Sequence, residues 1–174
     1  GSPNVGKSAL IGVLSSNEPE VAAYPFTTKQ LHVGHFEHRR RVYQMVDTPG
    51  LLDRPMEDRN NIEMQAIVAL ENIGSIVLFL LDPAEHGGTS MESQENLLAE
   101  VAALLPQTPL IVVDGKADLL KIDTGVNPVS GHLCISATEG YGIEQLREEL
   151  VARIHADDIA DTLLLPEWWH RYDR

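Results

Sequence analysis

The chain has 174 residues, 43% of them hydrophobic, so it is long enough for one domain with a real core and too apolar for a disordered chain. Its 26 acidic residues outnumber 13 Lys and Arg, and the net charge of −13 disfavours nucleic-acid binding through bulk electrostatics. The longest apolar run, 76–81, is too short to span a bilayer, and the single cysteine, Cys134, lies in an apolar stretch, which predicts a buried, reduced thiol in a cytoplasmic protein.

Residues 1–8, Gly-Ser-Pro-Asn-Val-Gly-Lys-Ser, satisfy the phosphate-binding pattern G-x-x-x-x-G-K-[ST], the P-loop. Gly1 and Gly6 allow the backbone to curl so that successive N–H groups face phosphate oxygens, and a helix expected over 6–14 adds its positive end. Lys7 would reach the β- and γ-phosphates, and the Ser8 hydroxyl would ligate Mg²⁺. The alternative is a Gly/Pro turn that precedes a lysine. The predicted nucleotide-binding residues here are Gly1, Ser2, Pro3, Asn4, Val5, Gly6, Lys7 and Ser8.

A P-loop normally follows a β-strand that aims it, whereas Gly1 opens this sequence. We therefore expect a nucleotide-binding domain truncated at its P-loop, with its first strand missing. An N-terminally extended chain is expected to melt at a higher temperature and to bind nucleotide more tightly.

The next stretch is predicted to be a polar connection over 17–24, followed by a loop, 24–29, with two threonines. A loop threonine can close over Mg²⁺ and the γ-phosphate, although a simple hydroxyl-rich turn is the alternative. Alternation over 31–37 and 41–46 predicts an antiparallel hairpin. Its basic turn, 38–41, would either contact RNA phosphate or form a solvated tip.

The second hairpin strand ends in Asp47-Thr48-Pro49-Gly50. An acid at a strand end followed by a turn and glycine suits a Mg²⁺ and γ-phosphate sensor. Asp47 would hold the metal through water, and the Gly50 N–H would meet the γ-phosphate. Leu51 stands where Ras-like GTPases carry the glutamine that orients water, so hydrolysis would need help from elsewhere.

Helices and buried strands alternate over the rest of the chain. We predict a helix over 63–73, a buried strand over 75–81, and a helix that opens with a Thr89–Glu92 capping box and stops at Pro106. Strands are expected over 109–113 and 133–135, and a final helix through Ile154. The connection 119–130 is too short and too rich in Gly and Pro for a full helix.

Residues 114–118, Asp-Gly-Lys-Ala-Asp, have the spacing of a guanine reader of the N-K-x-D type. Asp118 can accept from the N1–H and amino group of guanine, and Lys116 can lay its alkyl stem over the base. Gly115 replaces the usual asparagine, which puts guanine affinity in doubt. A plain acidic turn is the alternative. Farther along, the backbone of Ser136-Ala137-Thr138 could meet the guanine O6.

Together these motifs resemble the Obg-type P-loop GTPases, and within them the Nog branch and its archaeal relatives. The resemblance covers about residues 1–155 and is carried by 1–8, 24–29 with Val33-Gly34-His35, 47–51, and above all 57–67, Glu-Asp-Arg-Asn-Asn-Ile-Glu-Met-Gln-Ala-Ile. It implies Lys7 as phosphate clamp, and Ser8, Thr28 and Asp47 on the metal side, with Thr27 as the fallback for Thr28. It also implies that Lys116 and Asp118 read the base.

The resemblance further implies a three-layer α/β GTPase domain over 1–156, with a mainly parallel sheet and one antiparallel edge hairpin, and a C-terminal tail over 157–174. The expected activity is slow GTP hydrolysis with Mg²⁺, as a switch in large ribosomal subunit assembly. Asn4 matches an asparagine that binds K⁺ in related GTPases. The partners would be GTP or GDP and the large ribosomal subunit or its precursors, with no membrane or DNA. The predicted catalytic residues are Asn4, Lys7, Thr28 and Gly50, and the predicted nucleotide contacts beyond the P-loop are Asp47, Thr48, Pro49, Gly50, Leu51, Gly115, Lys116, Asp118, Ser136 and Ala137.

Two alternatives remain open. Leu51 would suit a nucleotide-dependent binding module with negligible hydrolysis. Gly115 would suit a P-loop NTPase with relaxed base specificity.

Overall fold

The computed structural model describes residues 1–23, 30–47, 75–120 and 125–163. In chain order the elements are α1 (Lys7–Leu14), β1 (Glu20–Ala23), β2 (Gln30–His38), β3 (Arg41–Asp47), β4 (Val77–Leu81), α3 (Met91–Leu104), β5 (Leu110–Asp114), α4 (Ala117–Leu120), β6 (Leu133–Cys134) and α5 (Ile143–Leu163). The predicted helix over 63–73 lies outside the described residues.

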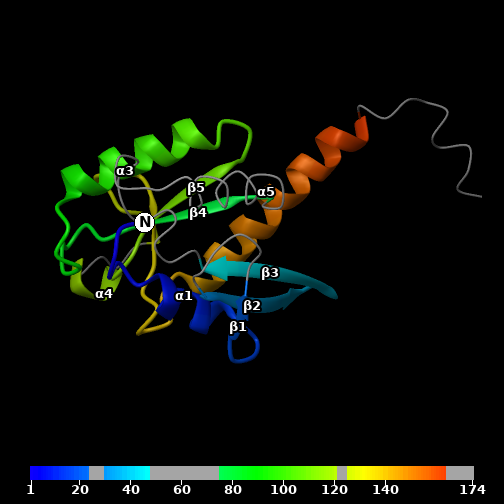
Figure 1. Ribbon diagram of the computed structural model, residues 1–174, viewed down its shortest axis with the longest axis horizontal. Helices are drawn as coiled ribbons and strands as arrows, with labels where there is room; N and C mark the ends of the chain where they lie inside the picture. The colour runs from blue at the N-terminus through cyan, green and yellow to red at the C-terminus, as the bar shows by residue number, and fades with distance from the viewer. Residues whose placement is uncertain (24–29, 48–74, 121–124, 164–174) are drawn as a thin grey trace, which may run out of the picture.

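A parallel sheet, β4–β5–β6, forms the centre of the domain, with helices on both faces (Figure 1). Successive side chains of a strand point to opposite faces, so β4 serves two cores. Phe79 and Leu81 pack against Leu97 and Val101 of α3. Leu80 packs on the other face, with α1 and α5. The three layers are therefore a direct consequence of an apolar strand with no polar face, and the predicted fold class is confirmed.

The antiparallel part is a three-stranded sheet, β1–β2–β3, beside α1 (Figure 1). The predicted hairpin is confirmed, with β2 and β3 paired from His32↔Asp47 to His38↔Arg41. The polar connection expected over 17–24 is wrong, because 20–23 forms the short strand β1. Its sequence, Glu-Val-Ala-Ala after Pro19, has little strand preference, so its pairing with β2 decides its conformation.

Helix α1 lies directly on β2 because the strand has a glycine there. A Cβ on Gly34 would collide with the Ser15 hydroxyl oxygen and come within 2.9 Å of Ile11 Cγ2. The Ser16 N–H also donates to the His35 carbonyl at 2.7 Å. These contacts fix the antiparallel sheet relative to the helix that follows the P-loop.

Two helix ends differ from expectation. The N-cap of α3 is Ser90, whose hydroxyl accepts from the Ser93 N–H, so the predicted Thr89–Glu92 box is wrong by one residue. Helix α5 continues to Leu163, beyond its expected end, while residues 164–174 lie outside the described part. No helix in the described ranges has the length and apolarity that a bilayer crossing requires.

Candidate functional site: a nucleotide site at the carboxyl edge of the sheet

The P-loop ends in a left-handed turn at the start of α1. Gly6 has φ 104° and is the N-cap of the helix, a conformation that glycine adopts without steric cost. The first turn of α1 contains no acidic residue, so nothing on the helix itself offsets its positive end. The Lys7 ammonium donates to the carbonyls of Gly1 at 2.9 Å and Ser2 at 2.7 Å. It is therefore held inside the loop, where a phosphate group would lie.

The loop also packs tightly on the sheet. Val5 and Ser2 are almost fully buried. A Cβ on Gly1 would collide with the Leu80 carbonyl oxygen of β4. Glycine at this position thus allows the loop to rest against the end of a central strand.

Two of the predicted metal-side residues meet, although they are far apart in the sequence. The Ser8 hydroxyl donates to Asp47 Oδ2 at 2.8 Å, and Asp47 is buried at the end of β3. A hydroxyl and a carboxylate are the hard oxygen ligands that Mg²⁺ prefers. The other residues predicted for this side lie outside the described part: Thr27, Thr28, Thr48, Pro49, Gly50 and Leu51.

A cavity of about 290 Å³ joins the P-loop to the predicted base-reading loops. Most of its lining comes from three stretches, the P-loop with the start of α1, the 115–119 turn and the 135–138 turn, and Leu80 and His86 complete it. The lining residues are Val5, Gly6, Ala9, Leu80, His86, Gly115, Lys116, Asp118, Leu119, Ile135, Ala137 and Thr138. The arrangement offers an apolar slot for a planar base, with one carboxylate and one ammonium at its rim.

Not every predicted base-side residue faces this cavity. Ser136 is fully buried, and its hydroxyl accepts from the Glu139 N–H at 3.1 Å, so it stabilises its own turn. Ala137 does line the cavity. Thr138, the last residue of the predicted 136–138 motif, also lines it. His86 lines it too, but nothing in its local sequence indicated this, because it reaches the site only through the fold.

Gly115 stands in a crowded position. A Cβ there would lie 3.0 Å from Leu80 Cδ1 and 3.2 Å from the Leu81 carbonyl oxygen. The Gly115 N–H donates to that same carbonyl at 2.8 Å. The departure from the expected asparagine therefore coincides with a close approach of the turn to β4.

Lys116 is held by a carboxylate that is not among the predicted site residues. Asp82, at the end of β4, is fully buried, and its Oδ2 accepts from Lys116 Nζ at 2.6 Å and from the Gly87 N–H at 2.7 Å. Buried Gln94 of α3 closes the network, accepting from the Asp82 N–H and donating to the carbonyls of Asp82 and Thr89. An aspartate at the end of an apolar run was the available signal.

A second buried carboxylate supports the other end of the same turn. Asp114 accepts from Asn127 Nδ2 at 2.6 Å and Ser130 Oγ at 2.7 Å, and its Oδ1 lies 3.1 Å from His132 Nδ1. This cluster ties the 127–132 segment to the end of β5. It also affects Cys134, whose thiol is buried as predicted. Burial raises the pKa of Cys134, and the Asp114 carboxylate raises it further.

The chain has clear relatives among GTP-binding proteins. A family profile described as Nucleolar GTP-binding protein 1 (NOG1) matches residues 61–118, and one described as Ferrous iron transport protein B matches residues 1–85. Nucleolar GTP-binding protein 1 of Saccharomyces cerevisiae is 41% identical over 144 residues, 83% of this chain and 22% of the relative. An uncharacterised protein of Methanocaldococcus jannaschii is 47% identical over 120 residues, 69% of this chain and 33% of the relative. The chain thus spans a third or less of these curated relatives.

Solved structures extend the likeness over the whole fold. A crystal structure of nucleolar GTP-binding protein 1 from Plasmodium falciparum superposes with a TM-score of 0.76 at 32% identity, covering 94% of this chain and 87% of that one. The cytosolic domain of the Thermotoga maritima FeoB iron transporter, in a GDP form, gives 0.68 at 22% identity over 88% and 60%, which shows the fold alone. This chain belongs to the nucleolar GTP-binding protein 1 family.

Proposed function

We propose that this chain binds GTP with Mg²⁺, hydrolyses it slowly to GDP and phosphate, and acts as a switch in the assembly of the large ribosomal subunit. The observation that carries the proposal is the Ser8–Asp47 contact of 2.8 Å at the open end of the P-loop. It unites two oxygen ligands from distant motifs beside the positive end of α1. The proposed ribosomal role is supported by the family membership and by the names of the relatives.

Ser8 and Asp47 would hold the metal, with Thr28 as the proposed third ligand. Mg²⁺ would supply positive charge to the oxygens of the transferring phosphoryl group. Lys7 would leave the Gly1 and Ser2 carbonyls to contact the phosphates. Its ammonium would then exchange two neutral carbonyl acceptors for negatively charged phosphate oxygens, which form stronger hydrogen bonds with it. The Gly50 N–H would meet the γ-phosphate.

Residues of the opposite wall would orient the nucleoside. Asp118 would accept from the guanine edge, Lys116 would cover the base, and the backbone at Ala137 would approach the O6. Asn4, which has φ 58° in the P-loop turn, would hold a K⁺ ion beside the phosphates. Such a cation would stabilise the negative charge that develops on the phosphates during hydrolysis, which the apolar side chain of Leu51 does nothing to offset.

Labelled GTP, followed through a single turnover, tests this proposal. We expect GTP to be retained and slowly hydrolysed with Mg²⁺ but not with EDTA, and hydrolysis to be faster in K⁺ than in Na⁺. Asp47→Asn should lower Mg²⁺-dependent GTP affinity by about tenfold, since it removes a charge of the metal site. Asn4→Ala should abolish the difference between K⁺ and Na⁺ in the rate of hydrolysis. Equal retention in EDTA would contradict the metal assignment.

Purified large ribosomal subunits provide the second arm of this experiment. We expect them to accelerate hydrolysis and to bind the GTP-loaded chain more tightly than the GDP-loaded chain. Nucleotide-dependent binding without any turnover would instead favour a binding module. Absence of both effects would refute the ribosomal role while leaving GTP binding in place.

A second candidate, an NTPase with relaxed base specificity, is favoured by one observation. Gly115 has no side chain to contact a base, and its Cβ position is crowded by Leu80. Competition of GTP, ATP and XTP for one labelled nucleotide separates the two. A preference for GTP above about 100-fold, the range that paired hydrogen bonds to a base edge provide, would reject this candidate.

A further inference from the structure

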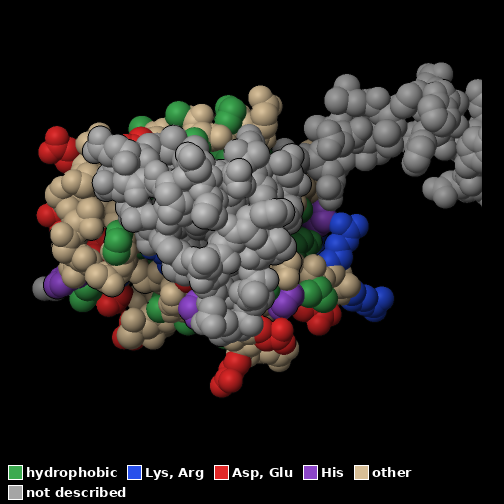
Figure 2. Space-filling view, viewed as in Figure 1, with side chains coloured by type: hydrophobic (Ala, Val, Ile, Leu, Met, Phe, Trp, Pro, Cys, Tyr) green, Lys and Arg blue, Asp and Glu red, His purple; other side chains and the backbone are tan. Residues whose placement is uncertain are grey.

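The turn between β2 and β3 concentrates positive charge on an otherwise acidic chain. Arg39, Arg40 and Arg41 are consecutive and exposed, and they are three of the 13 Lys and Arg that face 26 Asp and Glu. Figure 2 shows Lys and Arg atoms gathered at this end of the molecule, with histidine beside them. We call residues 38–41 the arginine tip.

The backbone of the arginine tip is poorly suited to its side chains. His38 pairs with Arg41, so Arg39 and Arg40 form a two-residue turn, with φ of 48° and 67°. Two successive left-handed residues define a turn type that strongly prefers Asn-Gly. Arginine at both positions is strained relative to that choice. The chain thus carries two arginines at positions where the backbone conformation favours Asn and Gly.

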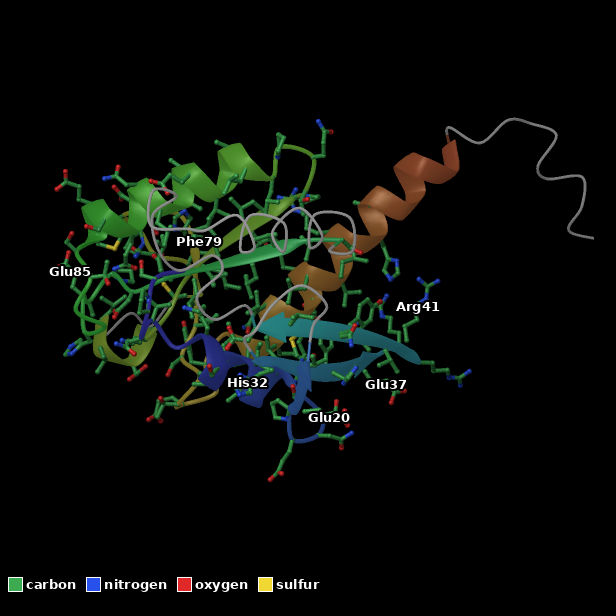
Figure 3. All side chains as sticks on the ribbon, in the orientation of Figure 1. Glu20, His32, Glu37, Arg41, Phe79 and Glu85 are labelled. Atoms are coloured by element: carbon green, nitrogen blue, oxygen red, sulfur yellow. The ribbon has the colours of Figure 1, made fainter. Side chains whose placement is uncertain are left out.

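The base of the tip is anchored, while its end is available. Arg41 Nη1 lies 3.2 Å from His155 Nδ1 of α5, and Tyr43 Oη lies 2.8 Å from Nε2 of the same ring. Within the described ranges, Arg39 and Arg40 make neither an ion pair nor a side-chain hydrogen bond. Figure 3 shows Glu37 as the labelled acid near Arg41, on the β2 side. Two guanidinium groups are therefore presented on a fixed support.

From this geometry we propose that the arginine tip docks on RNA, with Arg39 and Arg40 each contacting backbone phosphates. A guanidinium matches phosphate through paired N–H donors, and the exposed two-residue turn places both side chains where they can reach backbone phosphates. The net charge of −13 repels RNA elsewhere, so the contact is confined to the tip. In Figure 3 the tip lies across the molecule from Glu85, in the loop that precedes α3 next to the nucleotide cavity. The inference rests on the proposed ribosomal role, since it assigns that role a contact surface.

The matched variant for the test is Arg39→Asn with Arg40→Gly. It removes two charges and installs the residues that the turn prefers, so the melting temperature is expected to stay or rise. Binding of a fluorescein-labelled RNA stem–loop to the 174-residue chain is measured by anisotropy at several salt concentrations. We expect affinity to fall by about tenfold at low salt and the slope of log affinity against log salt to decrease by about 1 to 2.

Controls separate this site from general charge and from the nucleotide site. Arg153→Gln, which removes one positive charge from α5, should change RNA affinity less than Arg40→Gln. Labelled GDP affinity should be unchanged in the tip variants. If GDP binding fails in the parent chain while RNA binding persists, the proposed GTPase function is wrong and the RNA site stands.

Other polyanions give the remaining outcomes. Unchanged RNA affinity in the double variant would overturn the proposal. So would stronger tip-dependent binding to phosphatidylserine vesicles or to polyglutamate than to the RNA stem–loop, because a membrane or an acidic protein would then be the better partner. RNA binding that depends on the tip and exceeds both would support it.

Discussion

The cavity that we propose as the nucleotide site has two halves, built by different means, which we call the phosphate half and the base half after their proposed roles. The phosphate half consists of a short backbone turn and the start of α1, and Lys7 donates there to the carbonyls of Gly1 and Ser2 within the same loop. The base half consists of strand ends braced by Asp82 and Asp114, both fully buried and both partnered with residues from other elements. The comparison teaches that the phosphate half, which is a backbone turn, follows its sequence motif closely. The base half departs from its motif at Gly115, and buried side chains from elsewhere in the fold support it.

The largest expected effect concerns the base half. Lys116→Met would leave the Asp82 carboxylate buried with the Gly87 N–H as its remaining donor to Oδ2. We expect the free energy of unfolding to fall by about 3 kcal/mol, since an uncompensated buried charge is costly. Asp82→Asn, the matched control, should cost about 1 to 2 kcal/mol, because the Lys116 side chain, 23% exposed, can still reach water. Urea denaturation measures both, and equal losses would contradict the asymmetry.

In the phosphate half, the corresponding variant should mainly lower nucleotide affinity and should change stability little. Lys7→Met should lower GTP affinity by about 100-fold, because it removes a charge-assisted contact to phosphate. The free energy of unfolding should fall by about 1 kcal/mol, less than for Lys116→Met, since Lys7 donates to neutral carbonyls and not to a buried carboxylate. Titration of a labelled nucleotide, with a melting curve of each variant, checks the pair of values. A large loss of stability would show that the two halves are braced alike.

Gly115 offers a smaller test of how tightly the base half is packed. Gly115→Ala should destabilise the fold by about 1 kcal/mol, because the new Cβ crowds Leu80 and the Leu81 carbonyl. Gly115→Asn carries the same steric cost and adds the side chain that guanine readers of this type have. If Asn raises the preference for GTP over ATP relative to Ala, the missing side chain limits base reading. Equal preferences in the two variants would mean that it does not.

The smallest expected effect is the pH response of Cys134. Burial, and then the Asp114 carboxylate, raise its pKa in the folded chain above that in the unfolded chain. The folded state therefore holds the proton more tightly, so the contribution to stability is complete below the ordinary thiol pKa and is lost at more alkaline pH. Cys134→Ser should flatten the alkaline decline in melting temperature. In the parent chain, a thiol reagent should react with Cys134 only as the domain unfolds, and rapid reaction of the native chain would contradict this.

Much of the fold could be predicted from the sequence. Apolar runs and Gly or Pro at their ends gave β4, β5 and β6, and the alternation of the hairpin gave β2 and β3. Strand β1 could not be predicted, because Glu-Val-Ala-Ala becomes a strand only when β2 lies beside it. The N-cap of α3 was displaced by one residue since Thr89 and Ser90 are both plausible caps, and the loop geometry selects the second.

The sequence by itself determined the local turn of the P-loop, because Gly1, Gly6 and the helix after them favour that backbone conformation within eight residues. It also determined the layers of the sheet, since the apolar strands have no face that water could cover. Only the tertiary structure decided that Asp82 holds Lys116, that Asp114 secures the 127–132 segment, and that His86 borders the cavity. Those contacts join residues from separate elements, so their energies depend on distances that no local pattern records.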